Sequence, residues 1–169
     1  MTMNKQYGFL LLILPIAWMH SAPQKLPEKL EQIANESWQK KANRLLIISS
    51  SFEKNNSLKT NEKKQYRALI LNALHNDKAL LVRDTAVESI RRILKMNPQE
   101  APQWKSELEK AFFDKKNTVN KSGLFIRETI LRTFFEAAWE PSVAMMNSMK
   151  KDTNPRIFSQ QELWKTTSF

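Results

Sequence analysis

The chain has 169 residues, and its 41% hydrophobic content, with nine Phe and five Trp, is enough for the core of one ordinary domain. That content excludes disorder along the whole chain, and the absence of cysteine excludes a fold held by disulfides. The formal net charge of +10 would attract the chain to lipid headgroups, cell-wall polymers, nucleic acid or acidic proteins, although a solvated lysine-rich surface is the simpler explanation.

The first predicted element is an export signal at residues 1–22. Lys5 precedes a run of about twelve apolar residues, and small residues follow it up to Ala22, which is the layout of a secretory signal peptide. The run is shorter than the roughly 20 residues of a membrane-spanning helix, and Pro15 lies within it. We therefore expect cleavage near Ala22 and export to the bacterial periplasm or secretion. The alternative is an uncleaved signal that anchors the chain in the inner membrane.

The next elements are an amphipathic helix and a loop. Pro27 suits the first position of a helix, and apolar residues recur at three- or four-residue spacing up to Ile48, which predicts a helix over 28–50. The composition of the following stretch, SSSFEKNNSLKTN, predicts a loop that starts near Ser49.

Further helices are expected in the middle of the chain. A second amphipathic helix begins near Asn61, and a third occupies residues 79–95. The fourth, over 98–114, has the clearest start, because Asn97 can cap it and Glu100 can return a hydrogen bond to the cap amide.

The last strong helix runs from the predicted cap Ser122 through Trp139, and Pro141 cannot continue it. The periodicity fades beyond Lys150, where Ser159 and the acid three residues later have the spacing of a capping box for a short terminal helix. No stretch has a useful strand signal, and the chain contains only two glycines. The prediction is an all-α fold of antiparallel helical hairpins joined by short turns.

One arginine recurs in similar surroundings. The segment LLVRDTAVESIRRIL, residues 80–94, has a counterpart in FIRETILRTFF, so that Arg83 and Arg127 are forty-four residues apart in the same register. Helical phase places Arg83 beside Ile90, on the apolar face. A buried guanidinium needs a partner, because an unpaired buried charge costs several kcal/mol. We expect the Asp77 carboxylate to accept from Arg83, and main-chain carbonyls or Asp114 to accept from Arg127.

The segment HNDKALLVRDTAVESIRRIL resembles the HEAT repeat family. It carries the pattern D-x-x-x-x-V-R-x-x-A from Asp77 to Ala86, and the forty-four-residue period lies within the range of such repeats. The second copy has Lys121 where the turn aspartate belongs and Ile130 in place of the small alanine. An unrelated helical bundle with two similar helices is the alternative.

The resemblance implies a short α-solenoid in which the hairpins stack side by side. Its expected parts are a signal peptide, an N-terminal capping helix with its loop, two HEAT-like repeats and a C-terminal capping segment, over residues 1–22, 23–60, 61–140 and 141–169. Within the repeats, Asp77, Arg83 and Arg127 are expected to have structural roles.

Catalysis is not expected. His75 is the only histidine after residue 22, and cysteine is absent, so the sequence lacks the spacing of a zinc or di-iron centre. No serine motif of a hydrolase and no glycine-rich phosphate loop occurs either. We therefore expect no catalytic residue, no metal and no cofactor.

The family resemblance implies a protein-interaction scaffold that holds an unidentified protein partner on the surface lined by residues 80–95 and 123–139. Helical phase exposes five residues that we take as partner-binding, namely Arg91, Arg92, Arg132, Phe135 and Trp139. Exposed aromatic side chains typically mark an interface, although a tail that folds back from Pro141 over Phe135 and Trp139 is the explanation that we favour for these two.

An alternative function uses the positive charge. A helical domain can bind an anionic surface, such as cell-wall polymer, lipid or nucleic acid, through basic side chains along its helices. The candidates are the three arginines of the partner-binding set together with Lys40, Lys41 and Arg44. Self-association of the repeats is a further expectation for the partner.

Overall fold

The computed structural model describes residues 35–54, 58–118, 121–157, 159 and 164, so the expected signal peptide lies outside the described residues. Every regular element in the described part is helical, which confirms the all-α prediction. The helices are α2 (Trp38–Lys54), α3 (Thr60–Asn76), α4 (Leu80–Met96), α5 (Ala101–Phe113), α6 (Lys115–Thr118), α7 (Lys121–Glu136) and α8 (Val143–Lys150), with a 3₁₀ turn at Pro98–Glu100.

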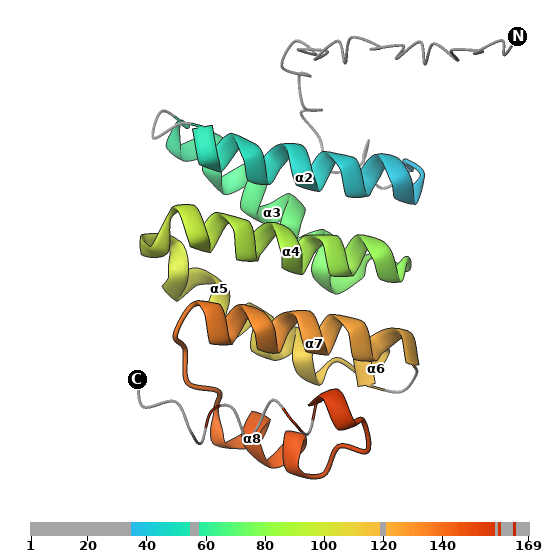
Figure 1. The fold of residues 1–169 in the computed structure, drawn as a ribbon. Coiled ribbons are helices and arrows are strands. Elements are labelled where there is room, and N and C mark those ends of the chain that lie inside the picture. The colour runs from blue at the N-terminus through green and yellow to red at the C-terminus, as the bar shows by residue number, and fades with distance from the viewer. Residues whose placement is uncertain (1–34, 55–57, 119–120, 158, 160–163, 165–169) are drawn as a thin grey trace, which may run out of the picture.

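The helices form two layers. Helices α2, α4 and α7 lie side by side in that order, whereas α3, α5 and α6 lie behind them and α8 lies beyond α7 (Figure 1). The chain passes between the layers through short connections, such as the three residues between α3 and α4. Each helix of the front layer therefore begins at the same end of the molecule, and the layer behind it runs in the opposite direction.

The front layer keeps a nearly constant register. The Ser89 hydroxyl lies 3.2 Å from the Leu45 carbonyl oxygen, across 44 residues of sequence. The Thr129 hydroxyl donates to Asp84 at 2.8 Å, across 45 residues. Because the contacts between α2 and α4 and between α4 and α7 share this separation, the three helices are parallel neighbours with the same offset.

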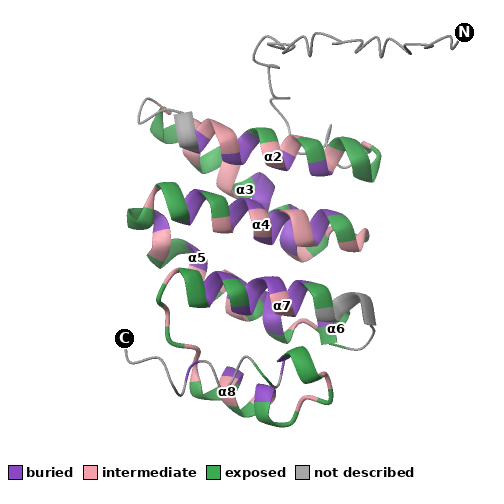
Figure 2. Ribbon diagram, in the orientation of Figure 1, coloured by how far each residue is buried: buried purple, intermediate pink, exposed green. Residues whose placement is uncertain are grey.

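The core lies between the layers and between neighbouring helices (Figure 2). In α4, burial falls on the positions that the sequence stripe predicts, since Val82, Ala86, Ile90 and Ile93 are all fully buried. Removing each large apolar side chain from water stabilises the fold by about 1.5–3 kcal/mol. The largest fully buried side chains are Trp104, Phe112, Phe134, Ile48, Ile70, Leu74, Ile90, Ile93, Leu108, Ile126, Ile130 and Leu131.

The boundaries of α2 differ from the prediction. Residues 35–37 are not helical, and the Ser37 hydroxyl accepts a hydrogen bond from the Lys40 amide at 3.5 Å, as an N-cap does. The helix continues into the first part of the predicted loop, as far as Lys54, because Phe52 is buried and the Ser49 hydroxyl donates back to a carbonyl in the preceding turn.

The predicted capping box at the start of α5 is wrong. The Asn97 side chain makes no cap hydrogen bond and donates instead to the Phe52 carbonyl oxygen at 3.1 Å. The Glu100 carboxylate is buried and pairs with Arg67 of α3. A buried carboxylate gains more from a cation than from a neutral amide, so Glu100 links two helices of the back layer.

Helix α7 ends at Glu136, before the predicted Trp139. The Trp139 amide donates to the Phe134 carbonyl, the Ala138 amide donates to the Phe135 carbonyl, and Ala138 has a φ of 52°. These features define a Schellman motif with alanine at the left-handed position. The rings of Phe134 and Trp139 meet edge to face, with centroids 5.3 Å apart, and supply the apolar contact that accompanies such a motif.

The C-terminal segment packs beside α7. Ser142 caps α8 by accepting from the Met145 amide at 3.2 Å, and Met145 and Met149 are buried. Trp164 is also buried and meets Phe135 edge to face, with centroids 5.8 Å apart. The predicted cap at Ser159 requires Glu162, which lies outside the described residues.

Candidate functional site

Arg83 lies in the interior, where helical phase placed it, but its partner atoms differ from the prediction. Its side chain is 5% exposed, and its guanidinium donates to the main-chain carbonyls of Asp77 and Lys78 at 2.8 and 3.1 Å. The predicted acceptor, the Asp77 carboxylate, instead binds Lys41 Nζ at 2.8 Å and the Ala79 amide. The turn before α4 directs two main-chain carbonyls at the Arg83 guanidinium, so these hydrogen bonds are made without a carboxylate.

Arg127 has the equivalent burial and a different partner. It donates to the Asp152 carboxylate at 2.5 Å and lies over the Phe112 ring, 4.3 Å from its centroid. Asp114, one of the predicted partners, accepts from the Lys116 amide instead. The sequence did not point to Asp152, because this residue lies after the two recognised repeats, which end at residue 140.

The same arrangement occurs three times along the front layer. Each front helix has a cation in its early turns. That cation binds an Asp or Asn side chain that follows the next helix of the chain, which is α3, α5 or α8. The pairs are Lys41 with Asp77, Arg83 with Asn117 and Arg127 with Asp152. Sequence reasoning missed Lys41 and Asn117, although Asn117 follows Asp77 by forty residues. These cations stabilise the contacts between successive helical pairs.

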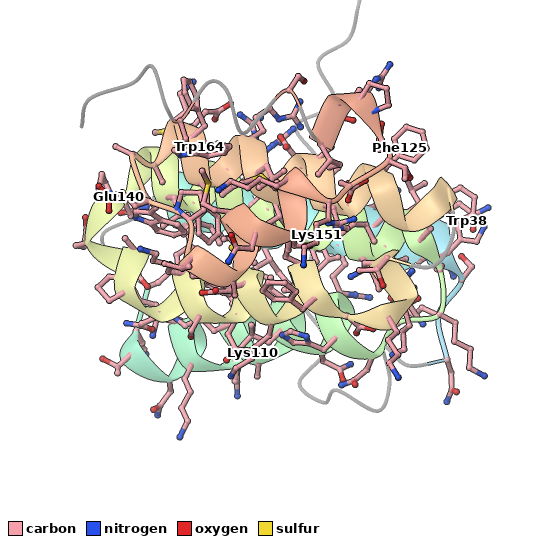
Figure 3. The ribbon with its side chains drawn as sticks, turned by 90° about the horizontal axis from the view of Figure 1, so that it is seen from below. Trp38, Lys110, Phe125, Glu140, Lys151 and Trp164 are labelled. Carbon is pink, nitrogen blue, oxygen red and sulfur yellow. The ribbon has the colours of Figure 1, made fainter. Side chains whose placement is uncertain are left out.

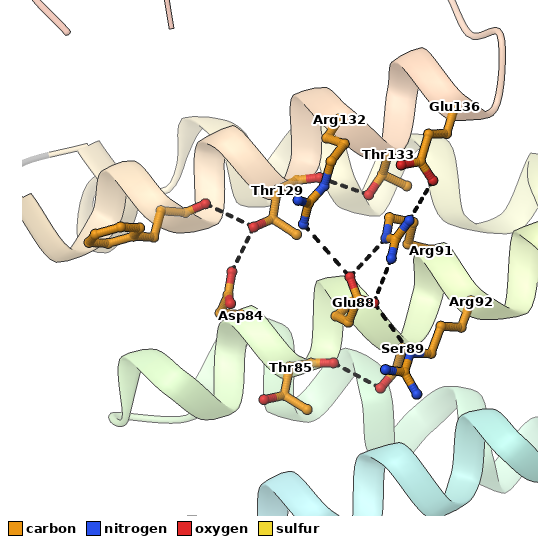
Figure 4. Close-up of polar contacts among 11 residues, drawn as sticks. Asp84, Thr85, Glu88, Ser89, Arg91, Arg92, Thr129, Arg132, Thr133 and Glu136 are labelled. Carbon is orange, nitrogen blue, oxygen red and sulfur yellow. Dashed lines mark hydrogen bonds and ion pairs between the residues drawn. The ribbon is translucent and has the colours of Figure 1, made fainter. Parts of the chain in front are cut away.

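Three of the five predicted binding residues meet on the open side of α4 and α7 at a network centred on Glu88 (Figure 4). Glu88 accepts from Arg91 Nη2 at 2.7 Å and from Arg92 Nε at 3.3 Å, and it lies 3.8 Å from Arg132 Nη2. Arg91 also donates to Glu136 of α7 at 2.6 Å, so the network joins the two helices.

The network shifts the pKa values of Glu88 and Arg91. The hydrogen bond from Arg91 holds the pKa of the Glu88 carboxyl below its ordinary value, while burial acts in the opposite direction. The hydrogen bond to Glu88 is also the largest effect that raises the pKa of Arg91. Both groups are charged near neutral pH, so this surface presents paired charges of both signs.

A hollow lies beside the network. It has a volume of about 360 Å³ and is lined by polar and apolar groups of both helices, namely Arg91, Leu94, Lys95, Thr133, Glu136 and Ala137. The Thr133 hydroxyl donates to the Thr129 carbonyl at 2.8 Å. The open side of α4 and α7 therefore combines exposed cations with a recess large enough for a side chain of a partner.

The two predicted aromatic binding residues are partly covered. Trp139 packs on the core through Phe134, and Phe135 is 37% exposed beside Trp164. The expected fold-back of the C-terminal segment is confirmed at Trp164. Arg92 and Arg132, with side chains 43% and 55% exposed, are the more open members of the predicted set.

Five of the six cations of the predicted anionic-surface set have acidic neighbours, and Lys40 is exposed. Lys41 pairs with Asp77, and Arg44 Nε donates to Glu36 at 3.1 Å. The three arginines of the set share the Glu88 carboxylate, and Arg91 also pairs with Glu136. A polyanion that follows this surface would compete with these internal pairs.

His75 of α3 faces Glu107 of α5, and its Nε2 lies 2.9 Å from Glu107 Oε2. The hydrogen bond from Lys110 is the largest effect that lowers the pKa of Glu107. No group of three His, Cys, Asp or Glu side chains that could hold a metal occurs among the described residues. In the same part of the chain, no helix combines the length and apolarity needed to cross a membrane.

No protein-family model, curated protein or solved structure matches this chain.

Proposed function

We propose that the chain is a non-catalytic protein-interaction scaffold of HEAT-repeat type, in which helical hairpins stack as a short α-solenoid. The observation that carries the proposal is the constant offset of 44 or 45 residues between contacting positions of α2, α4 and α7. A repeated supersecondary unit stacked on its neighbours produces such an offset. The cation that recurs at Lys41, Arg83 and Arg127, each with an Asp or Asn partner, supports the same interpretation.

The open side of α4 and α7 is the binding surface in this proposal. Arginine is enriched among residues that dominate binding energies at protein interfaces, and Arg92 and Arg132 are exposed next to the 360 Å³ hollow. Charges of both signs around Glu88 suit a protein partner with its own mixed charges better than a polyanion.

The test is a cross-linking pull-down from the native envelope fraction with charge-reversal variants. Arg92→Glu with Arg132→Glu is the test variant, and Arg91 stays intact because it ties α4 to α7. The control, Lys64→Glu with Lys110→Glu, changes the net charge equally on the back layer, where both lysines are exposed. Circular dichroism verifies that both variants are folded.

We expect the wild type and the control to recover the same protein and the test variant to lose it. Equal recovery by all three proteins would refute the binding surface. Loss of binding in both variants, together with a steep fall in added salt, would favour the anionic-surface function. Analytical ultracentrifugation of the wild type then identifies a second copy of the chain if that is the partner.

Export is part of the proposal. Intact-mass spectrometry of the protein from the native cell should show a chain that lacks residues 1–22. A full-length chain in the membrane fraction would instead support the uncleaved anchor.

A further inference from the structure

Three large apolar side chains are exposed at the end of the molecule where the front-layer helices begin. Trp38 is 46% exposed, Leu81 49% and Phe125 56%. They lie near the starts of α2, α4 and α7, and Figure 3 shows Trp38 and Phe125 at the same end of the molecule. Because packed helices are roughly 8–10 Å apart, the three form one row about 20 Å long across neighbouring helices.

The exposed acids of the described residues lie away from this row, whereas exposed lysines occur at both ends of the molecule. Among the side chains that the structure describes, the exposed acids are Glu136 and Glu140. Glu136 is the last residue of α7 and Glu140 follows it. Figure 3 shows Glu140 at the end opposite Trp38 and Phe125. The exposed lysines in the first turn of α2, in the turn before α4 and in α6 lie at the end that carries the row, and they are Lys40, Lys78, Lys115 and Lys116.

Two of the acidic residues near the row pair with cations, whereas Asp84 meets a neutral hydroxyl. Asp77 pairs with Lys41, Glu128 lies 3.4 Å from Arg156, and Asp84 accepts from Thr129. This end of the molecule therefore presents apolar anchors and surplus positive charge on one surface.

We propose that this end of the molecule, with Trp38, Leu81 and Phe125 as anchors, docks onto the surface of an anionic phospholipid membrane. Apolar and aromatic side chains in a field of lysines bind at the depth of the lipid headgroups, and the lysines are attracted to anionic lipid. None of the three anchors lines the hollow beside Glu88. A protein partner would be anchored by such a hollow, so the observations favour a lipid surface.

A local probe tests the contact. The chain has no cysteine, so Leu81→Cys and Glu140→Cys each give one site for an environment-sensitive dye in the full-length protein. The probe vesicles contain phosphatidylglycerol in phosphatidylcholine, and vesicles of phosphatidylcholine alone are the comparison. We expect a blue shift and a brighter emission at position 81 only, and only with the anionic vesicles.

The apolar segment at residues 1–22 is the same in both labelled proteins, so binding through that segment alone would leave the dye at position 81 in water. That outcome would overturn the proposal. Equal shifts at positions 81 and 140 would also overturn it, because they would show that no one end faces the membrane.

Lysine variants test the electrostatic part of the proposal. Each lysine near an anionic membrane strengthens partitioning about fivefold, so Lys78→Gln with Lys115→Gln should weaken it about 30-fold. The control, Lys64→Gln with Lys95→Gln, removes the same charge from exposed positions toward the other end. Equal weakening in both variants would contradict docking by this end. Arg92→Glu with Arg132→Glu should leave the dye response at position 81 in place, which separates this surface from the proposed partner-binding surface.

Discussion

At the scale of single residues, Arg83 and Arg127 show two ways to keep an inward-facing guanidinium satisfied. Arg83 uses main-chain carbonyls and the neutral Asn117 side chain, whereas Arg127 uses the Asp152 carboxylate and the Phe112 ring. The register of the two arginines could be predicted from the sequence. The acceptors could not, because the two carbonyls depend on the shape of the turn before α4, and Asn117 and Asp152 depend on how the next helical pair docks.

The difference between the two arginines leads to a prediction. Asp152→Ala leaves the Arg127 charge buried without its carboxylate and should lower the free energy of unfolding by about 3 kcal/mol. Asn117→Ala removes a neutral acceptor from Arg83 and should cost only about 1 kcal/mol. Urea titrations of the two variants measure both effects, and equal losses would show that Asp152 does not carry the charge of Arg127.

Ala138 supports a second prediction at this scale. Its φ of 52° is in the left-handed region, which costs alanine about 1 kcal/mol relative to glycine. Ala138→Gly should therefore raise the free energy of unfolding by about 0.5–1 kcal/mol. The control is Ala144→Gly, at an exposed position inside α8, which should be destabilising by a similar amount. A loss in both variants would argue against the Schellman geometry.

At the scale of helices, the apolar stripes predicted the elements but not all of their limits. α3 begins one residue before the predicted Asn61, and both ends of α4 lie one residue later in the chain than the predicted 79–95, because each stripe is bounded by a turn. α2 was predicted to start before residue 35 and to stop near Ser49. Its true limits depend on the Ser37 cap and on burial of Phe52 by α3 and α4, and a count of serines and asparagines cannot reveal that packing.

The candidate site was also predictable only in part. The phase of α4 and α7 placed Arg91, Arg92 and Arg132 on the open side. It did not reveal that Glu88 draws them together or that Trp139 leaves the helix after Glu136 and packs on Phe134. Both features arise from side chains of different helices that meet only in the folded chain.

The link between α4 and α7 should depend on pH. Folding lowers the pKa of Glu88 from its ordinary value of 4.5, so the stability that Glu88 contributes is fully present above that value and is lost as the pH falls through the lower folded pKa. Glu88→Gln should therefore lose less stability on acidification than the wild type. Unfolding free energies from pH 7 to acid measure this difference, and parallel curves would contradict it. Added salt should reduce the difference, because the pair is partly exposed.

At the scale of the whole molecule, α7 depends on the C-terminal segment for its cover. Trp164 is 8% exposed and meets Phe135, so Trp164→Ala should lower the free energy of unfolding by about 3 kcal/mol. Val143→Ala, at a side chain that is 78% exposed, is the control and should change it by less than about 0.5 kcal/mol. Chemical denaturation of both variants provides the measurement, and a small effect at Trp164 would show that the segment does not cover α7.

The parallel front layer also has a consequence for how the chain can reach its native state. Each approach of one front helix to the previous one closes a loop of about 45 residues, so the chain entropy lost per closure is nearly the same every time. No contact between front helices requires distant ends of the polypeptide to find each other. Assembly can therefore start at either interface and spread to the other without a larger entropic barrier.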